Sequence, residues 1–203
     1  MAKLRIKSQW FKTDSPKTPQ EAAGAMAFIV WRVAHNALTQ MRGARFDIDI
    51  GPQYFAFLRE WLVFLVQVVD RMAHERMGAD ERVAFTTALV LRVADHLADN
   101  ENRLLGAPPP GEETHQCRFI DLVNLLSTHY ADFGHGADGP DFAFMRYLGH
   151  RIEALMQQKD QNWVVDQVMA VEAPEAVQVL QRSLQGVLSN EPRALRRAGV
   201  SGD

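Results

Sequence analysis

The chain has 203 residues, of which 47% are hydrophobic and 23% charged, and its formal net charge is −3. This length is sufficient for one domain to bury a full core without disulfides or a structural metal. A chain with a net negative charge lacks the basic surface that is typical of nucleic-acid-binding domains, and no segment approaches the roughly 20 apolar residues of a membrane-spanning helix, so we expect neither a nucleic-acid partner nor a membrane span.

Residues 1–17 mix Lys, Ser, Asp and Pro and predict an irregular N-terminal arm. Its basic side chains are opposed only by Asp14. Two interpretations are open: a solvated tail, which we favour because so short a run releases few counterions, or an arm that contacts an anionic surface.

The first helix is expected over residues 18–41. The sequence Thr18-Pro19-Gln20-Glu21 is a capping box with proline at the first helical position, and Gly43 supplies a stop. Beyond it, apolar residues alternate with Asp47 and Asp49, which predicts a short extended link near 45–50 rather than an independent sheet.

The second helix, expected over residues 52–77, has the widest apolar face of the chain. Apolar side chains cover about half of its circumference, more than a surface helix usually needs. We therefore expect it to pack against several neighbours or against another subunit. The opposite face is polar, and its members are Arg59, Gln67, Asp70, Arg71 and His74.

The remaining helices are bounded by Gly or Pro and carry apolar residues at helical spacing. They are expected at 80–105, 112–133, 140–157, 162–171 and 174–189. A Pro-rich link, 107–111, separates two helical halves of one domain that spans 18–189, and the polar tail 190–203 is expected to be disordered. The sequence thus predicts an all-α, single-domain bundle of six or seven helices, mostly antiparallel.

Histidine and aspartate recur at helical spacing on three of these helices, and if their polar faces met inside the bundle they could hold a metal. The candidate ligands are His35, Asp70, His74, Asp95, His96 and Asp99. Imidazole and carboxylate suit zinc, iron or manganese. On each helix, however, these residues lie opposite the apolar face, and a solvated face with charge pairs gives the same spacing. A pair of Glu-x-x-His motifs, as in di-iron bundles, is also absent, because this pattern occurs once, at Glu112–His115, and His-Glu-x-x-His does not occur. We favour the solvated face and expect no cofactor.

Two further groups of residues are candidates for binding. Trp31, Phe57, Trp61 and Phe64 could line an apolar pocket or a subunit interface, although ordinary core is the simpler interpretation. His129 borders the apolar seam of the helix at 112–133 and is a candidate for a buried, titrating group.

The single cysteine, Cys117, cannot form an intramolecular disulfide, and the N-terminus lacks the apolar core and cleavage pattern of a secretory signal. Both features predict a cytoplasmic protein. The excess of arginine over lysine and the high alanine content are typical of a GC-rich bacterial genome.

No catalytic signature emerges from the sequence, and the question of an enzyme stays open, with the balance against it. Our first hypothesis is a non-enzymatic helical protein that acts through protein–protein interaction with an unknown partner or with itself, as a homodimer. The second is an enzyme or sensor that binds a metal or a small ligand through the inter-helix His and Asp residues. A third, weaker hypothesis is a binder of apolar ligands.

Overall fold

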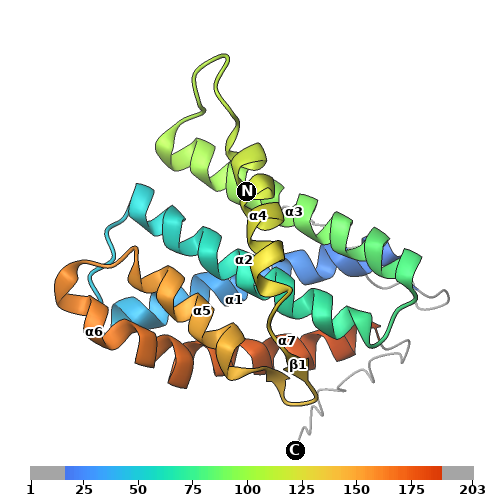
Figure 1. Cartoon of the computed structure of the whole chain (residues 1–203). Helices are drawn as coiled ribbons and strands as arrows, with labels where there is room; N and C mark the ends of the chain where they lie inside the picture. Colours follow the sequence, from blue (N-terminus) through green and yellow to red (C-terminus); the bar gives the residue numbers. More distant parts are fainter. Residues whose placement is uncertain (1–16, 189–203) are drawn as a thin grey trace, which may run out of the picture.

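The computed structural model describes residues 17–188 and folds them into an all-α bundle, as the sequence predicts. Figure 1 shows the order of the elements, and consecutive helices reverse direction along the first half of the chain. The elements are α1 (Pro19–Gly43), α2 (Pro52–His74), α3 (Ala79–Leu105), α4 (His115–Tyr130), β1 (His135–Gly136), β2 (Gly139–Pro140), α5 (Phe142–Glu153), α6 (Gln158–Gln167), a π-helical turn η2 (Val168–Glu172) and α7 (Ala173–Leu188).

Helix α1 begins at the capping box that the sequence predicts. The Thr18 side chain accepts a hydrogen bond from the Glu21 backbone N–H, and the Glu21 side chain accepts one from the Thr18 backbone N–H. Residues 45–50 form the expected link without any strand, and they bury Ile48 while Ile50 stays exposed.

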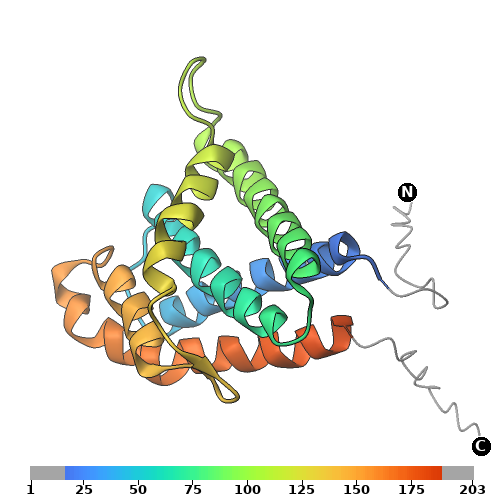
Figure 2. The same cartoon turned by 45° about the vertical axis from the view of Figure 1, so that its right-hand side comes forward.

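Helix α2 lies at the centre of the bundle, with α1, α3, α4, α5 and α7 around it (Figures 1 and 2). Its residues from Phe57 to Val69 are buried almost without interruption, Arg59 being the exception. The wide apolar face of this helix is thus covered within the chain itself. Because neighbours also cover its polar side, α2 is surrounded on nearly every side.

The Pro-rich segment between α3 and α4 projects from the bundle as a loop (Figures 1 and 2). At the other side of the molecule, β1 and β2 form a two-residue antiparallel hairpin in which His135 pairs with Pro140. The sequence pattern predicts no strand between the helices at 112–133 and 140–157. Strands of two residues leave no periodic pattern from which they could be predicted.

The last helices differ from the prediction of two separate helices. The segments α6, η2 and α7 follow one another without a break from Gln158 to Leu188. A proline inside an α-helix lacks a donor and its ring clashes with the carbonyl four residues earlier. The π-helical turn immediately before Pro174 widens the helix there, so the chain continues through a residue that we expected to start a new helix.

Candidate functional site

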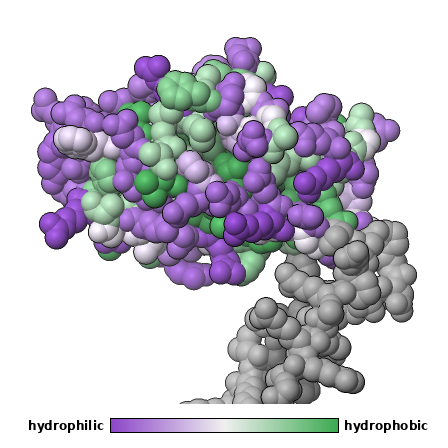
Figure 3. Space-filling view, turned by 90° about the horizontal axis from the view of Figure 1, so that it is seen from below, coloured by the Kyte–Doolittle hydropathy of each residue, from purple (hydrophilic) through white to green (hydrophobic). Residues whose placement is uncertain are grey.

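A groove of about 760 Å³ lies between α1 and the η2–α7 segment. Its α1 wall includes Phe28, Trp31 and His35, and its opposite wall includes Glu172 and Val179. The groove is open to solvent, so a ligand would lie along it rather than be enclosed. Figure 3 shows the face of the molecule seen from below, where apolar patches are bordered by polar side chains.

The α1 wall presents large apolar side chains to solvent. The Phe28 ring is 54% exposed, and the Arg32 guanidinium carbon lies 5.7 Å from its centroid. Trp31 is half-buried, and its ring centroid lies 6.3 Å from that of His96 on α3. An exposed phenylalanine beside a hollow is an arrangement that favours contact with a further molecule.

The opposite wall is contributed by η2 and α7. Val179 is 44% exposed, and Ala176 is buried at the base. Gln40 Nε2 on α1 donates a hydrogen bond of 3.3 Å to Glu175 Oε2, which fixes the width of the groove at that point.

Glu172, the last residue of η2, places a buried carboxyl group at the groove. It is only 2% exposed; its Oε1 accepts a 2.9 Å hydrogen bond from Gln167 Nε2, and its Oε2 has no partner among the described residues. Burial raises the pKa of this carboxyl group, because the charged form is poorly solvated there. No sequence signal marked Glu172, since a glutamate two residues before a proline is ordinary near a helix start.

The six candidate metal ligands fall into separate places. His35 lines the groove and its ring centroid lies 6.3 Å from that of Tyr54, while His96 faces Trp31. Asp95 Oδ1 accepts a 2.6 Å hydrogen bond from Gln116 Nε2, and Asp99 is exposed.

Asp70 and His74 both contact one arginine of α3. Arg82 on α3 donates to both carboxylate oxygens of Asp70, and its Nη1 lies 3.3 Å from His74 Nδ1. Thr86 donates a further bond of 2.7 Å to Asp70. Within residues 17–188, no group of three or more His, Cys, Asp or Glu side chains is placed to hold a metal ion.

The apolar candidates divide between groove and core. Of the four, only Trp31 lines the groove, while Phe57, Trp61 and Phe64 are fully buried. Trp61 and Phe64 pack edge to face with centroids 6.0 Å apart. These three aromatic residues belong to the core of the bundle, which is the simpler interpretation of the stripe.

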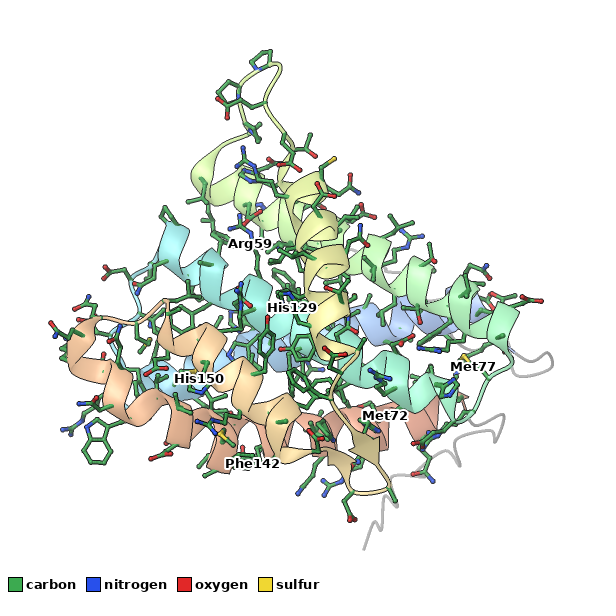
Figure 4. All side chains as sticks on the ribbon, viewed as in Figure 1. Arg59, Met72, Met77, His129, Phe142 and His150 are labelled. Carbon is green, nitrogen blue, oxygen red and sulfur yellow. The ribbon has the colours of Figure 1, made fainter. Side chains whose placement is uncertain are left out.

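His129 is exposed, which corrects the expectation of a buried titrating group. Its Nδ1 lies 2.7 Å from the Tyr147 hydroxyl oxygen, and Figure 4 shows His129 on α4. The buried histidine of this helix is His115, whose Nε2 lies 3.1 Å from the backbone carbonyl oxygen of Gly106.

Sequence reasoning also missed the ionic groups inside the bundle. Arg59, which we assigned to a solvated face, pairs with Glu101, a fully buried residue of α3, and Glu101 Oε2 lies 3.4 Å from His115 Nδ1 (Figure 4 labels Arg59). Burial raises the pKa of Glu101, while Arg59 and His115 oppose that rise. The set joins α2, α3 and α4 through one carboxylate.

A second ion pair joins α2 to α5. Arg151 Nε donates a 2.9 Å hydrogen bond to Glu60 Oε2, and a second bond from the same guanidinium reaches Oε1. Gln67, also expected on the solvated face, donates a 2.7 Å hydrogen bond to Ser127 on α4. Arg59, Glu60 and Gln67 therefore connect α2 to neighbouring helices.

No protein-family model, curated protein or solved structure matches this chain. Within residues 17–188, none of the helices is long and apolar enough to span a lipid bilayer.

Proposed function

We propose that this chain acts through protein–protein interaction rather than catalysis, and that the face formed by α1 and α7 is its contact surface. The observation that carries the proposal is the groove of about 760 Å³ beside the exposed rings and side chains of Phe28 and Val179.

A second copy of this chain is the partner that the surface fits best. A two-fold dimer uses the same patch on both subunits, so a protruding group and the hollow that receives it must lie on one face. Phe28 and the groove meet that condition, because Phe28 is itself part of the groove wall. In such a dimer, Phe28 of each copy enters the groove of the other.

The charged side chains of the groove favour one relative orientation of the two copies. Arg32 lies on the α1 wall and Glu175 lies on the opposite wall, and both side chains are exposed. A two-fold axis that brings one copy's α1 over the other's α7 pairs these basic and acidic residues, which favours that register over a parallel one.

Size-exclusion chromatography with light scattering tests the proposal. We expect a dimer for the wild-type chain at micromolar concentration and a monomer for Phe28→Asp, because a buried charge without a partner opposes association. Leu125→Asp is the matched control: Leu125 is 57% exposed on α4 and lies outside the groove. A monomeric wild type, or equal effects of the two substitutions, would contradict the proposal.

We place this activity in the cytoplasm. The support is Cys117, which is exposed and unpaired, a state that a reducing compartment maintains.

A further inference from the structure

A second hollow, of about 310 Å³, lies where the end of α2, the β1–β2 hairpin and α7 meet. Met72 and Glu75, His135, and Gln181 and Arg182 line it from these three directions. Figure 4 shows Met72 beside the hairpin. On α7 the residues that line this hollow, Gln181, Arg182 and Gln185, lie on a different side of the helix from the groove residues. The two hollows are therefore independent.

The hairpin wall of the hollow is firmly held. Asp141 caps α5 by accepting a 2.8 Å hydrogen bond from the Phe144 N–H, and its other oxygen accepts one of 2.8 Å from the Gly134 N–H. Gly139 has a φ of +108°, and a Cβ built there would lie 3.2 Å from Val177 on α7. Glycine is required at this position, since it allows both the backbone conformation and the close approach to α7.

His135 lies at this wall with its hydrogen-bonding groups unused. Its side chain is 5% exposed, and neither ring nitrogen has a hydrogen-bond partner among the described residues. The nearest carboxylate oxygen, Glu75 Oε1, is 3.9 Å from Nδ1, beyond hydrogen-bond distance. Burial lowers the pKa of His135, and Arg71 lowers it further, against the opposing effect of Glu75. The loop that carries His135 has no apolar periodicity, so no sequence signal marks the burial of this side chain.

Two guanidinium groups at the rim also lack partners. Arg76 and Arg182 line the hollow, and neither forms an ion pair or a side-chain hydrogen bond within the described chain. Arg71 differs, since its Nη2 donates to the backbone carbonyls of Tyr130 and Ala131. The hollow thus combines two unpaired cations, a histidine without partners and the amide groups of two glutamines.

From these groups we infer that the hollow binds a small oxyanion of the phosphate or sulfate class. Such an anion accepts several hydrogen bonds at once, which matches the guanidinium, imidazole and amide donors that line the hollow. Glu75 faces the same space and limits the affinity. A tetrahedral oxyanion fits within about 310 Å³ with room for a small organic substituent, so the anion is either free or the phosphate group of a small monoester.

Calorimetric titration with sulfate at constant ionic strength tests the inference. We expect saturable binding to the wild-type chain, weakened about fivefold to tenfold by Arg76→Gln or Arg182→Gln, as a charge-assisted hydrogen bond is lost. Both side chains are exposed, so these variants keep the fold. Arg103→Gln removes the same charge from an exposed position at the far end of α3 and leaves binding unchanged. Absence of saturation, or equal effects of all three substitutions, would overturn the inference.

Sulfate binding at two pH values separates the role of His135 from general electrostatics. Sulfate does not titrate in this range. The charged groups around His135 are Arg71 and Glu75, and Arg76 and Arg182 line the same hollow. In the wild type we expect sulfate to bind more tightly at pH 6 than at pH 8, because protonation makes both ring nitrogens of His135 hydrogen-bond donors. In His135→Gln we expect no such difference. Glycerol phosphate binding more tightly than inorganic phosphate would assign the site to monoesters. A pH difference that persists in His135→Gln would remove His135 from the site.

Discussion

Helix α2 and the groove between α1 and α7 differ in how far their side chains are covered by the rest of the chain. On α2, Arg59, Glu60 and Gln67 each have a partner on another helix. In the groove, Glu172 keeps one carboxylate oxygen without a partner, and Phe28 exposes more than half of its surface. On α2, Arg59 Nε and Trp61 Nε1 also lack hydrogen-bond partners. The two regions therefore differ mainly in exposure: other helices cover α2, whereas the groove leaves Phe28 in contact with solvent.

This comparison separates structural from interaction roles without any catalytic motif. The sequence alone could not assign the aromatic residues to the core or to a surface. Trp61 and Phe64 lie in the core, and Trp31 lines the groove. The core residues should therefore control folding, and the groove residues should control association while leaving the fold unchanged.

The largest expected effect on stability follows from Trp61→Ala. Trp61 is fully buried in the central helix, and removing a buried aromatic side chain costs about 3–5 kcal/mol through lost transfer energy and the cavity left behind. Urea unfolding measures the change. Trp163→Ala provides the control, because Trp163 is 69% exposed, and its substitution should change the free energy of unfolding by at most about 0.5 kcal/mol. Equal losses would show that α2 is not the centre of the core.

The next effect follows from Arg59→Met, which leaves the Glu101 carboxylate buried without its main cation. We expect a loss of about 3 kcal/mol at pH 7. The pKa of Glu101 is already raised by burial, so its contribution to stability is present below its unfolded pKa and is lost as pH rises through the folded one. Without Arg59 the pKa of Glu101 rises further, so the stability lost by Arg59→Met should be smaller at pH 4 than at pH 7. The double variant Arg59→Met with Glu101→Met should recover most of the stability, and a double variant as unstable as the single one would contradict this interpretation.

A smaller effect, on the order of 1 kcal/mol, is expected for Glu172→Gln. Burial raises the pKa of Glu172, so the folded state holds its proton more tightly than the unfolded state does. The stability that this group contributes is complete below its unfolded pKa and declines as pH rises through the folded value. Relative to the wild type, Glu172→Gln should thus become more stable from pH 4 to pH 8, as urea unfolding at both values measures. Glu81→Gln, at an exposed position, is the control. The same trend in Glu81→Gln would show that the burial of Glu172 is not its cause.

Much of the fold could be predicted from the sequence, because helix signals are local. The capping box at Thr18, the Gly and Pro boundaries and the wide apolar face of α2 are all read from neighbouring residues. Pro174 misled the prediction of the last helices, because the π-helical turn that accommodates it depends on the preceding five residues and on the packing around them.

The polar sites could not be predicted in the same way. Helical spacing shows which residues share a face, and it assigned Arg59 and Gln67 to solvent because they lie opposite the apolar side. Their partners Glu101 and Ser127 are 42 and 60 residues away in the chain. Only the arrangement of α3 and α4 around α2 places these groups together, and no periodic pattern encodes that arrangement. The sequence named His35 and Trp31 as candidates, but their position opposite Glu172 across the groove depends equally on distant segments.

Cysteine cross-linking tests the central claim most directly, namely that the α1–α7 face joins two copies of the chain. In a Cys117→Ser background, which removes the only native thiol, a single cysteine replaces Val179 in the groove wall or Leu125 on α4. Each Val179 faces the partner's α1 in this dimer, so a flexible bifunctional thiol cross-linker is used to join the two copies. Denaturing electrophoresis should then show a covalent dimer for Val179→Cys and monomer for Leu125→Cys. A covalent dimer that forms through position 125, or none through position 179, would contradict the account.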